Sequence, residues 1–126
     1  MADITPATPP EINLVQAYGN GGFRIGGVAH LGSVVVLPTR VEVWAVAAMA
    51  DVALDSLQIV IDAAPRVELL LVGCGGRLLP LPAELRRALR AAGIAVEPMD
   101  TGAACRTYNV LVTEGRRVAA ALIAIV

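Results

Sequence analysis

The sequence predicts an α/β fold in a single compact domain, with N-terminal β hairpins joined to a β-α-β-α-β mixed sheet and flanking helices. The length of 126 residues suits one hydrophobic core. Short strand-like runs alternate with glycine clusters in the first third, and apolar runs alternate with helical patterns in the C-terminal half. Three prolines among the first ten residues predict a loose tail over residues 1–11, so the domain spans 12–126.

The N-terminal part of the domain predicts antiparallel hairpins. Strands are expected over residues 12–18, 23–25 and 33–37, separated by glycine clusters at 19–22, 26–27 and 32. Residues 41–44 are a candidate for one more strand. No element is predicted for the alanine-rich residues 46–54. A helix is expected over residues 56–64, with Asp55 or Ser56 as its N-cap and Pro65 at its end.

The C-terminal half predicts three strands separated by two helices. The strands are expected at 67–72, 94–96 and 118–126, and the first of them is nearly all apolar, as a strand covered on both faces should be. One helix should begin at Pro82 and end at Gly93. The other should be capped by Thr101 and ended by Gly115, with Ala104, Leu111 and either Tyr108 or Thr107 on its buried face.

The composition excludes several classes of protein. Ten basic residues against 11 acidic ones leave a net charge of −1, which does not favour nucleic acid. The longest apolar run, residues 118–126, is far shorter than the ~20 residues of a membrane span. Two cysteines and one histidine are too few for structural zinc, and the absence of lysine excludes Schiff-base chemistry. No metal or cofactor is expected. The start of the chain lacks a secretory signal, so a cytoplasmic protein is predicted.

A glycine loop follows the first strand of the C-terminal half, where α/β sheets often bind ligands. It contains Gly73, Cys74, Gly75 and Gly76, but Leu78 replaces the third glycine of a dinucleotide fingerprint. Two interpretations therefore stay open, a tight turn and a small-ligand loop. Cys74 and Cys105 are expected near each other, and the helix N-terminus should lower the pKa of Cys105. The thiols are interpreted either as a redox switch or as small packing residues.

A polar cluster lies at the beginning of the last predicted helix. It consists of Arg106, Thr107, Tyr108 and Asn109, preceded by Asp100 and Thr101. A cation in the first turns of a helix opposes the helix dipole, so a carboxylate or another anion is expected to compensate Arg106, with Glu97 and Asp100 as the nearest candidates. The cluster predicts either a structural clamp, with Tyr108 buried and Asn109 hydrogen-bonded, or an exposed recognition site.

A second glycine-rich turn is flanked by Tyr18 and Phe23. It predicts a loop that approaches another backbone, or a hairpin turn whose aromatic side chains close one end of the core. His30 is expected in a polar turn without a catalytic role.

Several spaced motifs together resemble one protein family. They are Tyr18-Gly19-x-Gly21-Gly22-Phe23, Gly73-x-Gly75, Met99-x-Thr101-x-x-Ala104-x-Arg106-Thr107-Tyr108-Asn109 and Glu114-Gly115-Arg116-Arg117-Val118. In this order they resemble the domain-of-unknown-function family 498, which includes a mitochondrial complex I assembly factor. The resemblance covers residues from about 12 to the C-terminus. It implies a compact α/β domain and protein partners, and it brings no catalytic residues.

Two functions follow as expectations. The first is a non-enzymatic interaction or assembly factor for respiratory complex I or another inner-membrane complex, located in the cytoplasm or peripheral to the membrane through its partner. It would bind near the N-terminal hairpins and Arg106, and a homodimer is compatible with so apolar a chain. The second is a small anionic-ligand protein or enzyme with a pocket between the 73–76 loop and the 106–109 helix end. No complete catalytic set is present, which favours the first.

Overall fold

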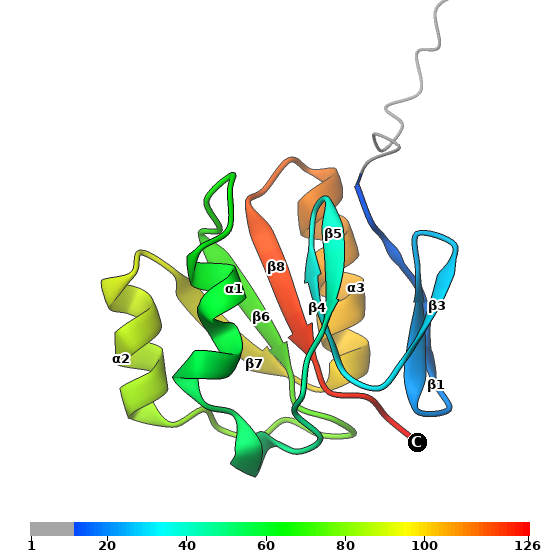
Figure 1. Cartoon of the computed structure of the whole chain (residues 1–126), viewed down its shortest axis with the longest axis horizontal. Coiled ribbons are helices and arrows are strands. Elements are labelled where there is room, and N and C mark those ends of the chain that lie inside the picture. The colour runs from blue at the N-terminus through cyan, green and yellow to red at the C-terminus, as the bar shows by residue number, and fades with distance from the viewer. Residues whose placement is uncertain (1–11) are drawn as a thin grey trace, which may run out of the picture.

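The computed structural model describes residues 12–126, and the tail predicted for residues 1–11 lies outside them. The predicted α/β fold is confirmed: the described residues form two β-sheets and three α-helices, arranged as Figure 1 shows. The strands are β1 (Val15–Gly19), β2 (Gly22–Ile25), β3 (Val28–Leu31), β4 (Val34–Leu37), β5 (Arg40–Val43), β6 (Leu69–Gly73), β7 (Ala95–Met99) and β8 (Val118–Leu122). The helices are α1 (Gln58–Ile61), α2 (Ala83–Ala91) and α3 (Thr101–Thr113).

The strands divide between a small antiparallel sheet and a larger mixed sheet. The small sheet has the order β1-β2-β3, and the large one has the order β5-β4-β8-β6-β7. Strand β6 is parallel to both β7 and β8, while β4 is antiparallel to β5 and β8. The crossovers through α2 and α3 make the C-terminal strands parallel, and the short loop between β4 and β5 makes that pair antiparallel.

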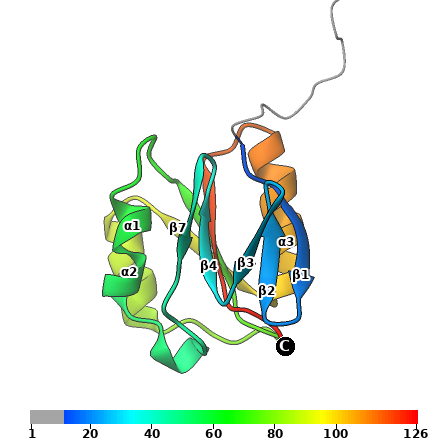
Figure 2. The ribbon, with the colours of Figure 1, turned by 45° about the vertical axis from the view of Figure 1, so that its right-hand side comes forward.

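The five-stranded sheet is covered on both faces. Helices α1 and α2 lie over one face, and α3 lies over the other beside the three-stranded sheet (Figure 2). The central strand β8 is fully buried, with Ala119 and Ala121 facing one layer and Ala120 facing the other. Its small side chains let both layers pack closely on the sheet. This explains why the last strand of the chain is rich in alanine.

The structure corrects two predictions in the first half of the chain. Strand β3 was not predicted, and His30, expected in a polar turn, lies half-buried within it. The predicted helix 56–64 is instead a 3-10 turn, Leu54–Leu57, followed by the single turn of α1. Neither Asp55 nor Ser56 caps it through its side chain. Leu57 and Val60, three residues apart, are both buried, a spacing that a 3-10 turn also satisfies.

The ends of the two longer helices lie close to their predicted positions. Pro82 precedes α2 as its N-cap, and Gly93, with a φ of +82°, follows its end. The N-cap of α3 is Asp100, whose carboxylate accepts the backbone N–H of Ala103 at 2.9 Å, and not Thr101 as predicted. Gly115 ends α3 as predicted. Its φ is +83°, and its N–H and that of Arg116 bond to carbonyls of the last turn, as in a Schellman motif.

Candidate functional site

Thr101 joins three segments at the amino end of α3. Its side chain is fully buried, and its hydroxyl accepts the N–H of Gly75 at 2.9 Å and donates to the carbonyl of Ile123 at 2.8 Å. The backbone N–H of Thr101 donates to Gly75 O at 2.8 Å. A Cβ on Gly73 would lie 3.0 Å from both Thr101 Cα and Leu122 Cδ2, so any side chain there would require these neighbours to shift, and the close approach favours glycine. The motif residues Gly73, Gly75 and Thr101 therefore form a structural junction.

The glycine loop has few groups left to hold a ligand. The amide of Gly75 is bonded to Thr101, and the amide of Cys74 donates to Met99 O at 2.7 Å. The Cys74 side chain is buried in the core layer beneath α1 and α2, and its thiol donates to Leu79 O at 3.5 Å. This geometry favours the interpretation of residues 73–76 as a tight turn.

The two thiols do not form a pair. Cys74 and Cys105 are both free and buried, but they belong to core layers on opposite faces of the five-stranded sheet. The expectation that they are neighbours was therefore wrong. The predicted direction of the Cys105 pKa was also wrong: burial raises the pKa of Cys105 from 9.0 to about 12, and the nearby charge of Arg106 lowers it by less. Desolvation outweighs the helix N-terminus because the thiol faces the core.

Asn109 holds α3 against the first strand. Its side-chain amide donates to Val15 O at 2.8 Å, and its side-chain oxygen accepts the N–H of Val15 at 2.8 Å. Thr107 is half-buried, and Tyr108 is fully buried with a hydroxyl that has no partner among the described residues. Burial also raises the pKa of Tyr108. The structure thus places Asn109 and Tyr108 as the clamp interpretation expected.

Arg106 is exposed beside Tyr18. Its Nη1 atom lies 3.4 Å from the Tyr18 hydroxyl, and within residues 12–126 it forms no ion pair with Glu97 or Asp100. Since Asp100 is engaged as the N-cap of α3, the expected compensation of Arg106 by these carboxylates is not formed. A cavity of about 280 Å³ opens here, lined by Val15, Gln16, Ala17, Tyr18, Cys105, Arg106 and Asn109. It lies between β1 and α3 and does not include the glycine loop.

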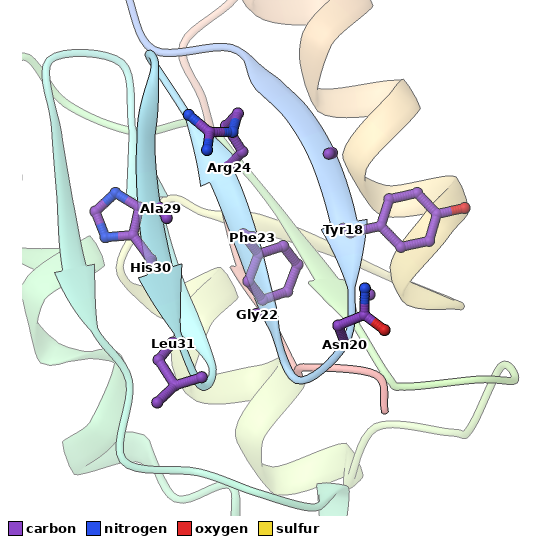
Figure 3. Close-up of a pocket in the computed structure, with 10 residues that line it drawn as sticks. Tyr18, Asn20, Gly22, Phe23, Arg24, Ala29, His30 and Leu31 are labelled. Carbon is purple, nitrogen blue, oxygen red and sulfur yellow. The ribbon is translucent and has the colours of Figure 1, made fainter.

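A larger hollow of about 440 Å³ lies on the three-stranded sheet (Figure 3). Its lining includes Phe23 and its register partners Tyr18 and His30, and also Ala17, Arg24 and Ala29, whose side chains lie on the outer face, away from the buried side chain of Phe23. In register, Ala17 pairs with Arg24 and Arg24 with Ala29, while Gly22 pairs with Gly19 and with Leu31. This outer face therefore consists mainly of alanine and glycine, with Arg24 and Leu31 as its long side chains. A Cβ on Gly22 would meet the carbonyl oxygen of His30, so glycine is required there.

The two edge strands of this sheet, β1 and β3, expose apolar side chains. In β3, Leu31 is 87% exposed and Val28 is 56% exposed, and Tyr18 on β1 is 43% exposed. Sequence reasoning selected Tyr18 and Phe23 but missed the hollow and β3. The sequence signal for this outer face was the presence of alanine and glycine at alternate positions of short strands, with glycine pairs separating the strands.

Residues 12–126 hold no group of three or more His, Cys, Asp or Glu side chains arranged to bind a metal ion. In the same part of the chain, no helix has the length and apolar character needed to cross a membrane.

Known proteins resemble this chain over nearly all of its described length. An NADH dehydrogenase [ubiquinone] 1 alpha subcomplex assembly factor 3 of Xenopus tropicalis is 39% identical over 113 residues, which cover 90% of this chain and 62% of that protein. An uncharacterised protein of Rhodobacter capsulatus is 42% identical, over 86% of this chain and 82% of its own length. The chain thus spans about 62% of the length of the Xenopus assembly factor.

A solved structure and a family model also match this chain. The solution structure of a Bordetella pertussis protein, a Mth938-like domain, matches with a TM-score of 0.82 at 34% identity, covering 98% of this chain and 92% of that one. The family model for the protein of unknown function DUF498/DUF598 matches residues 15–123. That span includes both sheets and all three helices. The chain therefore belongs to the DUF498/DUF598 family.

Proposed function

We propose that this chain is a protein-binding assembly factor for a respiratory NADH dehydrogenase, or for a related membrane complex, and that it binds a subunit through the outer face of its three-stranded sheet. The name of the Xenopus relative supports the assembly role. The hollow of about 440 Å³, whose lining includes the 87% exposed Leu31, is the observation that carries the choice of surface.

The outer face has the properties of a docking surface. Alanine and glycine leave the backbone of β1, β2 and β3 open to close approach, and Leu31 supplies an exposed apolar anchor. Strand β3 is an edge strand, so one side of its backbone is available to pair with a strand of a partner. An extended subunit segment lying beside β3 would contact Leu31 on the outer face, and its other side would cover Val28, which pairs with the buried Ile25 and faces the opposite side of the sheet.

In this role the chain binds a partner protein and catalyses no reaction. Association with the membrane would come from the partner, so the protein works in the cytoplasm or peripherally at the membrane. Homodimerisation through the same outer face stays a prediction, and it would compete with the partner.

Affinity purification from gently solubilised cells of the source organism tests the proposal. The tagged chain should recover NADH dehydrogenase subunits, identified by mass spectrometry, and Leu31→Glu should reduce that recovery at least fivefold. Leu78→Glu, at a 62% exposed leucine in the loop after β6, is the matched control and should recover the wild-type amount.

Each outcome decides one part of the proposal. Absence of these subunits with the wild-type chain would contradict the assembly role. Equal recovery with Leu31→Glu and wild type would contradict the choice of surface. Circular dichroism and thermal unfolding should show that both variants fold. Sedimentation velocity of the purified chain measures self-association separately.

A further inference from the structure

A second pocket, which shares no lining residue with the hollow on the three-stranded sheet, lies where β6 and β8 begin and β4 ends. Its volume is about 350 Å³. Its apolar lining is formed by Ile12, Pro38, Pro65, Val67 and Val112. Val67 belongs to the core layer under α1 and α2, and Val112 belongs to the layer under α3. The pocket is thus the place where both core layers reach the surface.

Three arginines line the same pocket, and no acidic residue does. Arg66 precedes β6, and Arg116 and Arg117 precede β8. Arg117 faces Glu68 at 3.9 Å, with more than half of each side chain exposed, which is a weak pair. Within residues 12–126, the side chains of Arg66 and Arg116 form no ion pair or hydrogen bond with another residue.

The local fold brings these arginines to the pocket. The Schellman turn at Gly115 reverses the chain after α3, so that Arg116 and Arg117 come directly before β8. Arg66 also lines the pocket, while its guanidinium lies beside the turn after α2: a Cβ on Gly93, which is not part of the lining, would lie 3.0 Å from Arg66 Nη2. The Glu114-Gly115-Arg116-Arg117 motif therefore both ends a helix and places cations.

We infer that this pocket binds a small amphipathic carboxylate, whose apolar chain lies on the valine and proline lining and whose carboxylate meets the arginines. Guanidinium groups bind carboxylates through paired, charge-assisted hydrogen bonds. A volume of about 350 Å³ lies within the roughly 300–1,000 Å³ of small-molecule pockets. The inference does not depend on the proposed function, which uses a surface with none of these lining residues.

Isothermal titration of the full chain with decanoate tests the inference. Decanoate should bind saturably at one site per chain, and decanol and acetate should each bind at least tenfold more weakly, because each lacks half of the recognised chemistry. The double variant Arg66→Gln, Arg116→Gln should weaken decanoate binding at least tenfold. It leaves the Arg117–Glu68 pair in place. Arg87→Gln, an exposed arginine on α2, is the control and should bind as the wild type does.

The outcomes separate the ligand classes. Absence of saturable decanoate binding overturns the inference. Equal affinities for decanol and decanoate show that the arginines do not recognise the anion, which overturns it as well. Unchanged binding in the double variant places decanoate elsewhere. Chemical shifts of the Val67 and Val112 methyl groups should move on titration in the wild type, and thermal unfolding should show that the double variant is folded.

Discussion

Tyr108 is a buried residue whose hydroxyl forms no hydrogen bond within the described part of the chain. The side chain is fully buried in the layer beneath α3, and its oxygen has no hydrogen-bond partner among the described residues. Burying an unsatisfied hydroxyl costs free energy. We expect Tyr108→Phe to raise the free energy of unfolding by about 1 kcal/mol, measured by urea denaturation. Tyr18→Phe, at an exposed tyrosine, should stay within about 0.5 kcal/mol of wild type. A clear loss of stability in Tyr108→Phe would show that the hydroxyl is satisfied.

Cys105 predicts a dependence of stability on alkaline pH. Burial raises the pKa of the folded thiol to about 12, whereas the unfolded thiol ionises near 9.0. Below pH 9 both states hold the proton, so the stability is fully present. As the pH rises from 9 towards 12, only the unfolded state loses its proton, and the free energy of unfolding should fall by roughly 1 kcal/mol per pH unit. Cys105→Ala should show a shallower fall in urea titrations over this range, while Tyr108 adds a loss of the same sign. An unchanged slope in Cys105→Ala would contradict the assignment.

At the scale of elements, the amino end of α3 depends on one hydroxyl. Thr101→Val keeps the shape of the side chain but removes the acceptor for Gly75 N–H and the donor to Ile123 O. We expect the free energy of unfolding to fall by about 2–4 kcal/mol, because two backbone groups lose their partner in a buried place. Thr113→Val, at the exposed last residue of the same helix, should change it by less than about 0.5 kcal/mol. Equal effects in the two variants would contradict the structural role of Thr101.

The elements also show what the sequence determines locally. Gly93 and Gly115 end their helices as predicted. The residue after the last helical turn adopts a positive φ, a conformation that favours glycine, so the sequence itself marks this position. Aspartate and threonine are both residue types that cap helices, so the sequence alone does not choose between Asp100 and Thr101. The Thr101 hydroxyl bonds to Ile123 O in the folded protein, and Asp100 caps α3. Strand β3 has no buried side chain, so no alternation of buried and exposed residues marks it, and its place depends on pairing with β2.

The whole molecule explains which parts of the candidate site were predictable. The strand–helix order of the C-terminal half determined a sheet with helices on both faces. It did not determine that Cys74 and Cys105 would face different layers, because that depends on which face each crossover covers. The outer hollow and the arginine pocket each combine segments far apart in the chain. Their residues carry no local pattern that unites them before folding.

The attachment of the small sheet to the rest of the molecule gives a last prediction. Asn109 bonds both backbone groups of Val15, so it ties β1 to α3 at one point. Asn109→Ala leaves these two groups without partners, and the core beneath β6 and β8 is untouched. We expect hydrogen exchange to accelerate at least tenfold in β1, β2 and β3 and to change little in β6 and β8. If the outer face of the small sheet binds the partner, the loosened sheet has to become ordered on binding, and this costs free energy. Recovery of the partner should then fall although no residue of that outer face has changed. Uniform acceleration across both sheets would show instead that the molecule opens only as one cooperative unit, and partner recovery would then follow global stability.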